Sequence, residues 1–191
     1  MTLPEQRPDI ELPGLDLSIS LLAANVYGAA VAIILTPLLF GIYYLVNPSF
    51  DLLLLSKPIV LIVSIVLGVF VHELLHGLTW QIASKQPSSV IRYGINWKLL
   101  TPYAHCSEPI NVQYYRIGIL MPTIILGLIP YIVVLFVQEP NLLLFSIIFT
   151  IAGSGDLVVF WIIRNLHSDT VVMDHPSRAG CYVFLIKKIG K

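Results

Sequence analysis

The chain has 191 residues, of which 57% are hydrophobic and only 12% are charged, and its formal net charge at pH 7 is zero. A water-soluble domain carries about a quarter charged residues, so this composition excludes an ordinary soluble fold, and its hydrophobicity excludes a disordered chain. A nucleic-acid-binding protein needs an excess of basic residues, so the balanced charge also excludes that class of protein. The composition therefore predicts a small membrane protein, with the lipid bilayer as a partner and no nucleic acid.

Four apolar stretches are long enough to cross the hydrocarbon core of a bilayer, which takes about 20 helical residues. We expect these spans at about residues 21–46, 58–83, 117–137 and 142–163. The chain then divides into an N-terminal tail (1–20), a four-helix membrane domain (21–166) with a long loop (84–116), and a C-terminal tail (167–191). Because the links at 47–57 and 138–141 are short, they predict antiparallel, adjacent spans within each pair.

The charged residues predict how the spans are oriented. The first 20 residues carry four acidic side chains and one basic one, Arg7, unlike the basic start of a signal peptide, so we expect the first span to be a retained anchor. Ten of the eleven Lys and Arg residues fall in the tails, in the long loop or, for Arg164, directly after the fourth span, and only Lys57 falls on the other side. The positive-inside rule then predicts a multi-pass protein of the cell membrane with both termini in the cytoplasm.

The segments outside the spans contain candidate strands. Apolar and polar residues alternate from Ile91 to Leu99, which is typical of a strand with one buried face. The tail shows a weaker version at 170–173 and 181–186, separated by a turn that contains Pro176 and Gly180. The predicted fold class is an all-α polytopic membrane protein, four transmembrane helices with small cytoplasmic β-hairpin elements.

Four ionisable residues interrupt the predicted spans: His72, Glu73 and His76 in the second, and Asp156 in the fourth. An ionisable group in the bilayer interior costs several kcal/mol, so it indicates a functional site by default. His76 and Asp156 each lie about eight residues, or 12 Å, from the cytoplasmic end of their span. The two side chains should therefore lie at matching depths.

Residues 72–76 form the pattern His-Glu-x-x-His. On a helix, positions i and i+4 share a face, so both imidazoles can bind one zinc ion, and Glu73 beside them can act as general base toward the attacking water. A hydrolytic zinc site has three protein ligands, and Asp156 is the candidate for the third. The alternative is a buried polar network in which these groups only satisfy one another.

The backbone near Asp156 and the residues outside the spans add weaker signals. Residues 152–155 are poor helix formers, which permits local unwinding beside Asp156, and Pro37, Pro122 and Pro130 are expected to kink their helices. Five other residues could fold back to a metal ion, although each is also explained as a solvated loop residue: His105, Glu108, His167, Asp174 and His175.

The motifs that carry a family resemblance are spread over residues 60 to 185. They are the segments 72–77, 102–106, 121–122 and 153–157, together with Asp174 and Gly180. In these motifs the chain resembles the DUF3267 family of zincin peptidases, which is similar in layout to the M50-like site-2 proteases. In that layout a core of three spans carries His-Glu-x-x-His on the first and an aspartate ligand on the third. Here a glycine precedes Asp156 instead of following it.

The resemblance implies zinc ligands at His72, His76 and Asp156 and a catalytic base at Glu73. It also implies that His105 and Asp174 are secondary site residues, with no role assigned. The predicted function is an intramembrane zinc metalloprotease that hydrolyses a peptide bond of a membrane protein or peptide in or near a membrane segment. Two alternatives stay open: a non-hydrolytic metal-binding or transport protein, and an inactive protease-like scaffold. The strand from Ile91 could hold extended substrate by edge pairing, or only cover the site.

Overall fold

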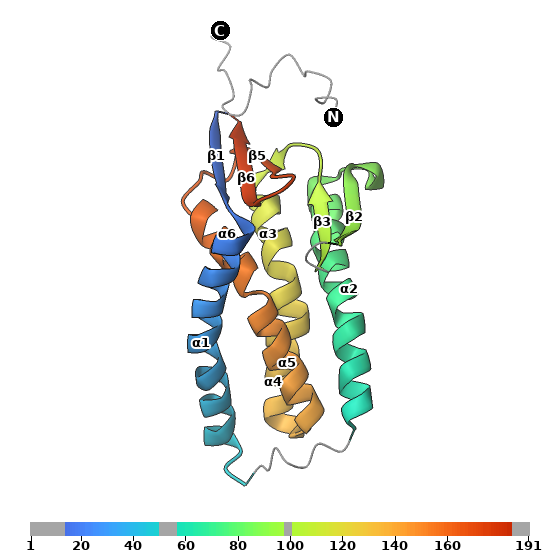
Figure 1. Cartoon of the computed structure of the whole chain (residues 1–191), viewed down its shortest axis with the longest axis vertical. Helices are drawn as coiled ribbons and strands as arrows, with labels where there is room; N and C mark the ends of the chain where they lie inside the picture. Colours follow the sequence, from blue (N-terminus) through green and yellow to red (C-terminus); the bar gives the residue numbers. More distant parts are fainter. Residues whose placement is uncertain (1–13, 50–56, 98–100, 185–191) are drawn as a thin grey trace.

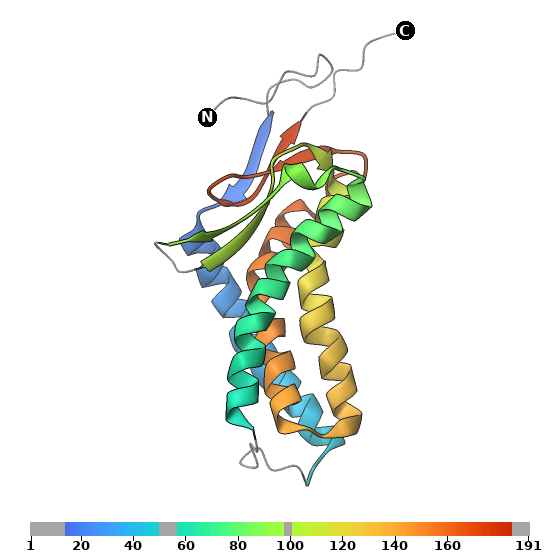
Figure 2. The ribbon, with the colours of Figure 1, turned by 90° about the vertical axis from the view of Figure 1, so that its right-hand side faces the viewer.

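The computed structural model describes residues 14–49, 57–97 and 101–184. It consists of a bundle of four long helical stretches with two small antiparallel sheets at one end, which we call the sheet end (Figures 1 and 2). The fold is thus mostly helical, as predicted, although one of the sheets is larger than the hairpins expected.

Each predicted span corresponds to one helical stretch that is long and apolar enough to cross a membrane. The first two are single helices, α1 (Leu21–Val46) and α2 (Pro58–Ser84). The third consists of α3 (Val112–Pro122), a wider π-helical turn η2 (Thr123–Leu128) and α4 (Ile129–Val137). The fourth consists of α5 (Pro140–Ala152) and α6 (Ser154–Ile163). The third stretch begins earlier than predicted because its first turns are too polar to resemble a span, yet Val112 and Tyr115 are buried at the sheet end.

Local sequence explains where these helices begin. The Ser20 hydroxyl accepts a hydrogen bond from the Ala23 N–H at 3.1 Å, which caps α1. Pro58 and Pro140 occupy the first positions of α2 and α5, where a missing N–H costs no helical hydrogen bond. The Glu139 carboxylate accepts from the Leu142 N–H at 2.6 Å and closes the start of α5.

The packing of the helices corrects one prediction. α1 packs against α5 and α6, whereas α2 packs against α3 and α5. The first two helices run antiparallel, but α4 and α5 lie between them in Figure 1, so they are not the packed pair that we expected. The link 47–57 is long enough for this, because eleven extended residues reach about 35 Å. The tight link 138–141 does join packed neighbours, α4 and α5.

The half of α2 far from the sheets has little protein around it. Among residues 58–71 Gly68 alone is buried, where a Cβ would collide with the Phe149 ring of α5. Ile59, Leu67 and most other large side chains of this half are exposed. α2 is therefore held to the bundle mainly through its half near the sheet end.

The two sheets lie side by side at the sheet end. One has the strand order β1 (Leu15–Ile19), β6 (Ala179–Phe184), β5 (Val171–Asp174), β4 (Ile110–Asn111), and the other is the hairpin of β2 (Ile91–Asn96) and β3 (Thr101–Cys106). The predicted strand from Ile91 and the predicted tail hairpin are confirmed within the described residues; positions 98–99 and 185–186 lie outside them. β1 lies in a segment that we predicted only as a tail, because its partner β6 is far away in the chain.

Gly180 allows β1 to pair with β6. Its φ of +128° lies where residues with a side chain are rarely found, and Ser18 is its partner across the strands. A Cβ on Gly180 would lie 2.7 Å from the Ser18 Cα. A glycine is therefore required for the first strand to join the sheet.

A hydrophobic core joins both sheets to the ends of the helices. Its buried members include Trp80, Cys106, Tyr115, Ile163, Val172 and Cys181. These residues come from α2, β3, α3, α6, β5 and β6. The core fixes the sheet-end half of α2, which carries the candidate site, against α3 and α6.

Candidate metal centre

Three side chains from two helical stretches converge inside the bundle. His72 and His76 lie on one face of α2, and Asp156 lies in the first turn of α6. The Asp156 Oδ2 atom is 3.2 Å from the His72 Nε2 atom and 3.6 Å from the His76 Nε2 atom. Both imidazoles are buried, with exposed fractions of 9% and 6%. The equal depths expected from the sequence thus correspond to direct contact, while the role of these residues as metal ligands stays a prediction.

A break in the fourth helical stretch brings Asp156 to this position. α5 ends at Ala152 and α6 begins at Ser154, so Gly153 separates them, as the poor helix formers predicted. Gly153 lies directly against the Thr123 side chain of η2, where a Cβ would not fit. Close approach of the third and fourth stretches therefore depends on this glycine.

The donor set fits a zinc ion. Two ligands about 2.1 Å from a tetrahedral zinc ion are separated by about 3.4 Å, and the two distances from Asp156 lie on either side of that value. One donor atom from each of the three residues lies within 4.8 Å of the other two. Two imidazoles and one carboxylate are also ligands that zinc commonly takes.

The surroundings of the two imidazoles support the same assignment of donor atoms. The His76 Nδ1 atom lies 2.9 Å from the Gly118 carbonyl oxygen of α3, so Nδ1–H donates to it and Nε2 is the ring nitrogen that faces Asp156. The His72 Nδ1 atom is buried and has no hydrogen-bond partner among the described residues. Nε2 is therefore the ring nitrogen through which both histidines would bind a metal ion.

Glu73 is held by the backbone of β3 and not by either histidine. Its Oε2 atom accepts a hydrogen bond from the Ala104 N–H at 2.8 Å. In the β2–β3 ladder the Ser107 N–H bonds to the Val90 carbonyl, and alternation along β3 then directs the Ala104 N–H away from β2. The outer edge of β3 thus faces Glu73.

Aromatic rings continue the histidine face of α2 toward the sheets. The His76 and Trp80 rings stack with centroids 5.6 Å apart, and the Trp80 and Tyr115 rings stack at 5.4 Å. The Trp80 indole N–H also donates to the Tyr115 carbonyl at 3.1 Å. Sequence reasoning did not identify Trp80, although its position four residues after His76 extends the same helical stripe.

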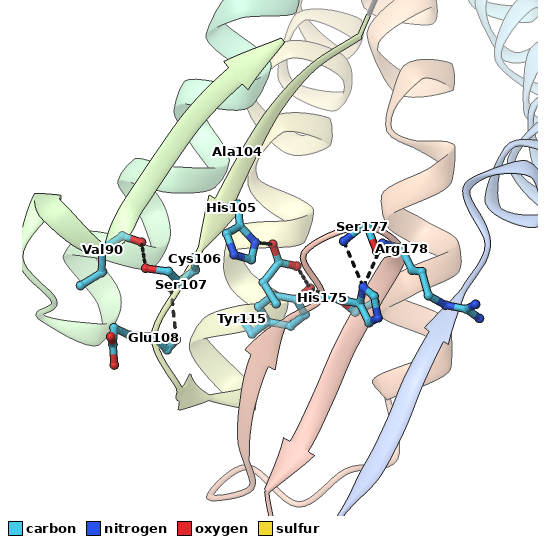
Figure 3. Close-up of polar contacts among 12 residues, drawn as sticks. Val90, Ala104, His105, Cys106, Ser107, Glu108, Tyr115, His175, Ser177 and Arg178 are labelled. Carbon is cyan, nitrogen blue, oxygen red and sulfur yellow. Dashed lines mark hydrogen bonds and ion pairs between the residues drawn. The ribbon is translucent and has the colours of Figure 1, made fainter. Parts of the chain in front are cut away.

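The two secondary candidates lie together but outside this group. The His105 Nδ1 atom is 2.8 Å from the Asp174 Oδ2 atom, and the Tyr115 hydroxyl donates to Asp174 Oδ1 at 2.6 Å (Figure 3). Figure 3 shows the His105 ring directed from β3 toward the strands of the other sheet. This contact ties the hairpin to the four-stranded sheet, so His105 and Asp174 are not the solvated loop residues considered in the sequence.

The remaining candidates do not reach the metal group either. His175 is buried in the turn between β5 and β6, and His167 forms an exposed pair with Asp169 at 3.5 Å. Glu108 contributes its backbone carbonyl to a contact with the Cys106 thiol at 3.5 Å. Solvation explains His167, and it also explains the Glu108 carboxylate, which makes no hydrogen bond or ion pair among the described residues.

The two cysteines are poor zinc ligands in this fold. Burial raises the pKa of the Cys106 thiol to about 11 and that of the Cys181 thiol to about 12. Zinc binds the thiolate form, which these values disfavour at neutral pH. The histidine and aspartate group is therefore the better metal site among the described residues.

Comparison with known proteins places the chain in a family. The profile of DUF3267, described as "Putative zincin peptidase", matches residues 65–171, which is more than half of the chain and includes both histidines, Glu73 and Asp156. The chain therefore belongs to the DUF3267 family.

One curated relative and the solved structures complete the comparison. The relative is the "Uncharacterized 24.7 kDa protein in gap 5'region" of Pyrococcus woesei, 28% identical over 119 residues, or 61% of this chain and 52% of that protein. The chain thus aligns with about half the length of this curated relative. No solved structure matches the chain.

Proposed function

We propose that the protein is a membrane-embedded zinc metallopeptidase that hydrolyses a peptide bond of a membrane protein or peptide, in or near a membrane segment. The observation that carries the proposal is the convergence of His72, His76 and Asp156 at separations that suit a tetrahedral ion, with the Glu73 carboxylate on the same helix. Membership of a family described as zincin peptidases supports the same reaction class.

The residues divide the chemistry among them. A zinc ion bound by His72, His76 and Asp156 would polarise the scissile carbonyl and acidify the attacking water. Glu73 would accept the proton of that water and deliver it to the leaving amine. The Ala104 N–H, which donates to Glu73 at 2.8 Å, would keep that carboxylate in place while the burial of both histidines limits the access of bulk water.

The proposed setting is a bilayer crossed by the four long helices. His76 lies about 12 Å along α2 from Ser84 at the sheet end, so cleavage would occur within the membrane and nearer to that end. Lys85, Arg92 and Arg178 lie at the sheet end, which the positive-inside rule assigns to the cytoplasm. Arg164 stacks over the Trp161 ring at 3.6 Å, a combination suited to the membrane interface.

Glu73→Gln tests the proposal most directly. The purified variant should keep its zinc, because Glu73 is not a ligand, and should lose peptide-bond hydrolysis by a factor of about 100 or more. His72→Ala and Asp156→Ala should lose zinc as well as activity. Glu108→Gln is the matched control, because among the described residues the Glu108 carboxylate makes no hydrogen bond and only its backbone carbonyl makes a contact.

Zinc content is measured by elemental analysis, and hydrolysis by mass-spectrometric detection of new N-termini in a mixture of detergent-solubilised membrane peptides. Cleavage that survives in Glu73→Gln would contradict the peptidase mechanism. Zinc binding without cleavage in the wild type would instead favour the metal-binding or transport alternative.

A further inference from the structure

The Gly118 carbonyl, which accepts the His76 hydrogen bond, belongs to the interior of a helix. In an α-helix the carbonyl of residue i normally accepts from the N–H of residue i+4. For Gly118 that residue is Pro122, which has no N–H. The following N–H, that of Thr123, bonds to the Leu120 carbonyl instead. The helix thus leaves the Gly118 carbonyl without its usual donor.

The neighbouring helix uses this acceptor. The His76 Nδ1 atom lies 2.9 Å from the Gly118 oxygen, and Pro122 and His76 are both buried. Gly118 also has no room for a Cβ, because the Trp80 indole lies directly over it. The absence of a side chain at Gly118 allows α2 to approach α3 closely. Pro122 leaves the Gly118 carbonyl oxygen available to accept the hydrogen bond from His76.

We propose that Pro122 is a positioning residue for His76. By withholding a backbone N–H, it dedicates the Gly118 carbonyl to His76 Nδ1–H, which fixes the imidazole tautomer and directs Nε2 toward Asp156. This inference rests on the proposed function for its purpose, but it concerns a hydrogen bond within the protein. It also assigns a role to the proline of the 121–122 motif, which the sequence indicated only as a helix kink.

Pro122→Ala tests this role, because it restores an N–H that can bond to the Gly118 carbonyl along the helix. Competition for that oxygen should weaken the His76 hydrogen bond and lower zinc affinity about 10- to 100-fold, the usual cost of losing a contact that orients a metal-bound histidine. The helix itself should be no less stable, since alanine is a better interior helix residue than proline.

Pro130→Ala is the matched control. It restores an N–H in the same helical stretch, eight residues or about 12 Å further along, and should leave zinc affinity unchanged. Zinc affinity is measured by competition with a chelating dye, and the His76 hydrogen bond by the exchange protection of its Nδ1 proton in ¹⁵N-labelled, zinc-loaded protein. Melting of the zinc-free variants in detergent confirms that both are folded.

We expect a protected His76 Nδ1 proton in the wild type and in Pro130→Ala, and a faster-exchanging Nδ1 proton in Pro122→Ala. Wild-type zinc affinity together with wild-type protection of the His76 Nδ1 proton in Pro122→Ala would overturn the inference and leave the peptidase proposal intact. Conversely, an absence of hydrolysis by the zinc-loaded wild type would overturn the peptidase proposal but not the result for the His76 hydrogen bond.

Discussion

His175 shows at the scale of a single residue how burial decides protonation. Its Nδ1 atom accepts hydrogen bonds from the backbone N–H groups of Ser177 at 3.1 Å and Arg178 at 2.9 Å, so this nitrogen carries no proton (Figure 3). Its Nε2 atom lies 2.9 Å from the Tyr182 hydroxyl. Burial lowers the pKa of His175 below 6.5, although Asp16 and Asp174 oppose the shift. The neutral ring thus closes the β5–β6 turn.

This environment predicts that acid weakens the β5–β6 turn. Because the pKa of His175 is lower in the folded protein than in the unfolded chain, the unfolded chain takes up the proton first as the pH falls. The contribution of His175 to stability is therefore complete above about pH 6.5 and is lost as the pH falls from there through the folded pKa. His175→Asn, which keeps an acceptor oxygen but cannot titrate, should melt with a weaker pH dependence between pH 7.5 and 5. An identical pH dependence in the two proteins would contradict this assignment.

At the scale of elements, β3 is the strand that connects the sheets to the candidate site. Its backbone N–H at Ala104 donates to Glu73, and its His105 side chain bonds to Asp174 of β5. Strand β3 already contains Pro102, whose missing N–H also faces away from β2. A second proline at an outward position should therefore be tolerated.

Ala104→Pro should separate the hairpin from Glu73 without unfolding it. We expect the activity per bound zinc to fall about 10-fold, with unchanged zinc content, because only the N–H that holds Glu73 is removed. His105→Leu should have a milder effect in the same direction, and His105→Asn, which can still donate to Asp174, should restore activity. His167→Leu is the control, since His167 is exposed. A loss of zinc in Ala104→Pro would show that the strand supports the ligands instead.

At the scale of the whole molecule, the proposed membrane orientation rests on the uneven distribution of Lys and Arg along the sequence. Ser49 and Ser177 are both exposed. Ser49 follows the end of α1 far from the sheets, whereas Ser177 lies between β5 and β6 at the sheet end. The native Cys106 and Cys181 are buried, and their raised pKa makes them slow to react with maleimides. In intact cells a membrane-impermeant maleimide should label Ser49→Cys, and it should label Ser177→Cys only after permeabilisation. The reverse pattern would invert the proposed topology.

Much of the candidate site could be predicted because few ionisable residues interrupt the apolar spans. His72 and His76 share a helix face by their spacing alone, and counting residues along two spans was enough to pair them with Asp156. The contributions of Gly118 and Ala104 could not be predicted in this way, because each acts through a backbone atom. Gly118 acts through its carbonyl oxygen, which every residue carries, and Ala104 acts through its N–H, which every residue except proline carries. Their roles depend on which helix or strand lies opposite.

In the overall fold, too, the elements that depend on local sequence could be predicted, whereas contacts between distant segments could not. Hydrophobic length located the four long helices, and local alternation located β2 and the β5–β6 hairpin. The pairing of β1 with β6 joins segments more than 150 residues apart, for which no local pattern exists. The separation of α1 from α2 likewise depends on which helix faces pack best, which the length of the link does not determine.

Because the outer half of α2 is sparsely packed, a bound zinc ion would also restrain the position of this helix. The three proposed zinc ligands lie on chain segments about 80 residues apart, so a bound ion would act as a cross-link that restrains α2 against α6. Chelation would then loosen the sparsely packed outer half of α2, and backbone deuterium uptake should rise in residues 58–71 much more than in α5. In this arrangement the metal would stabilise the packing of the helix bundle as well as take part in hydrolysis.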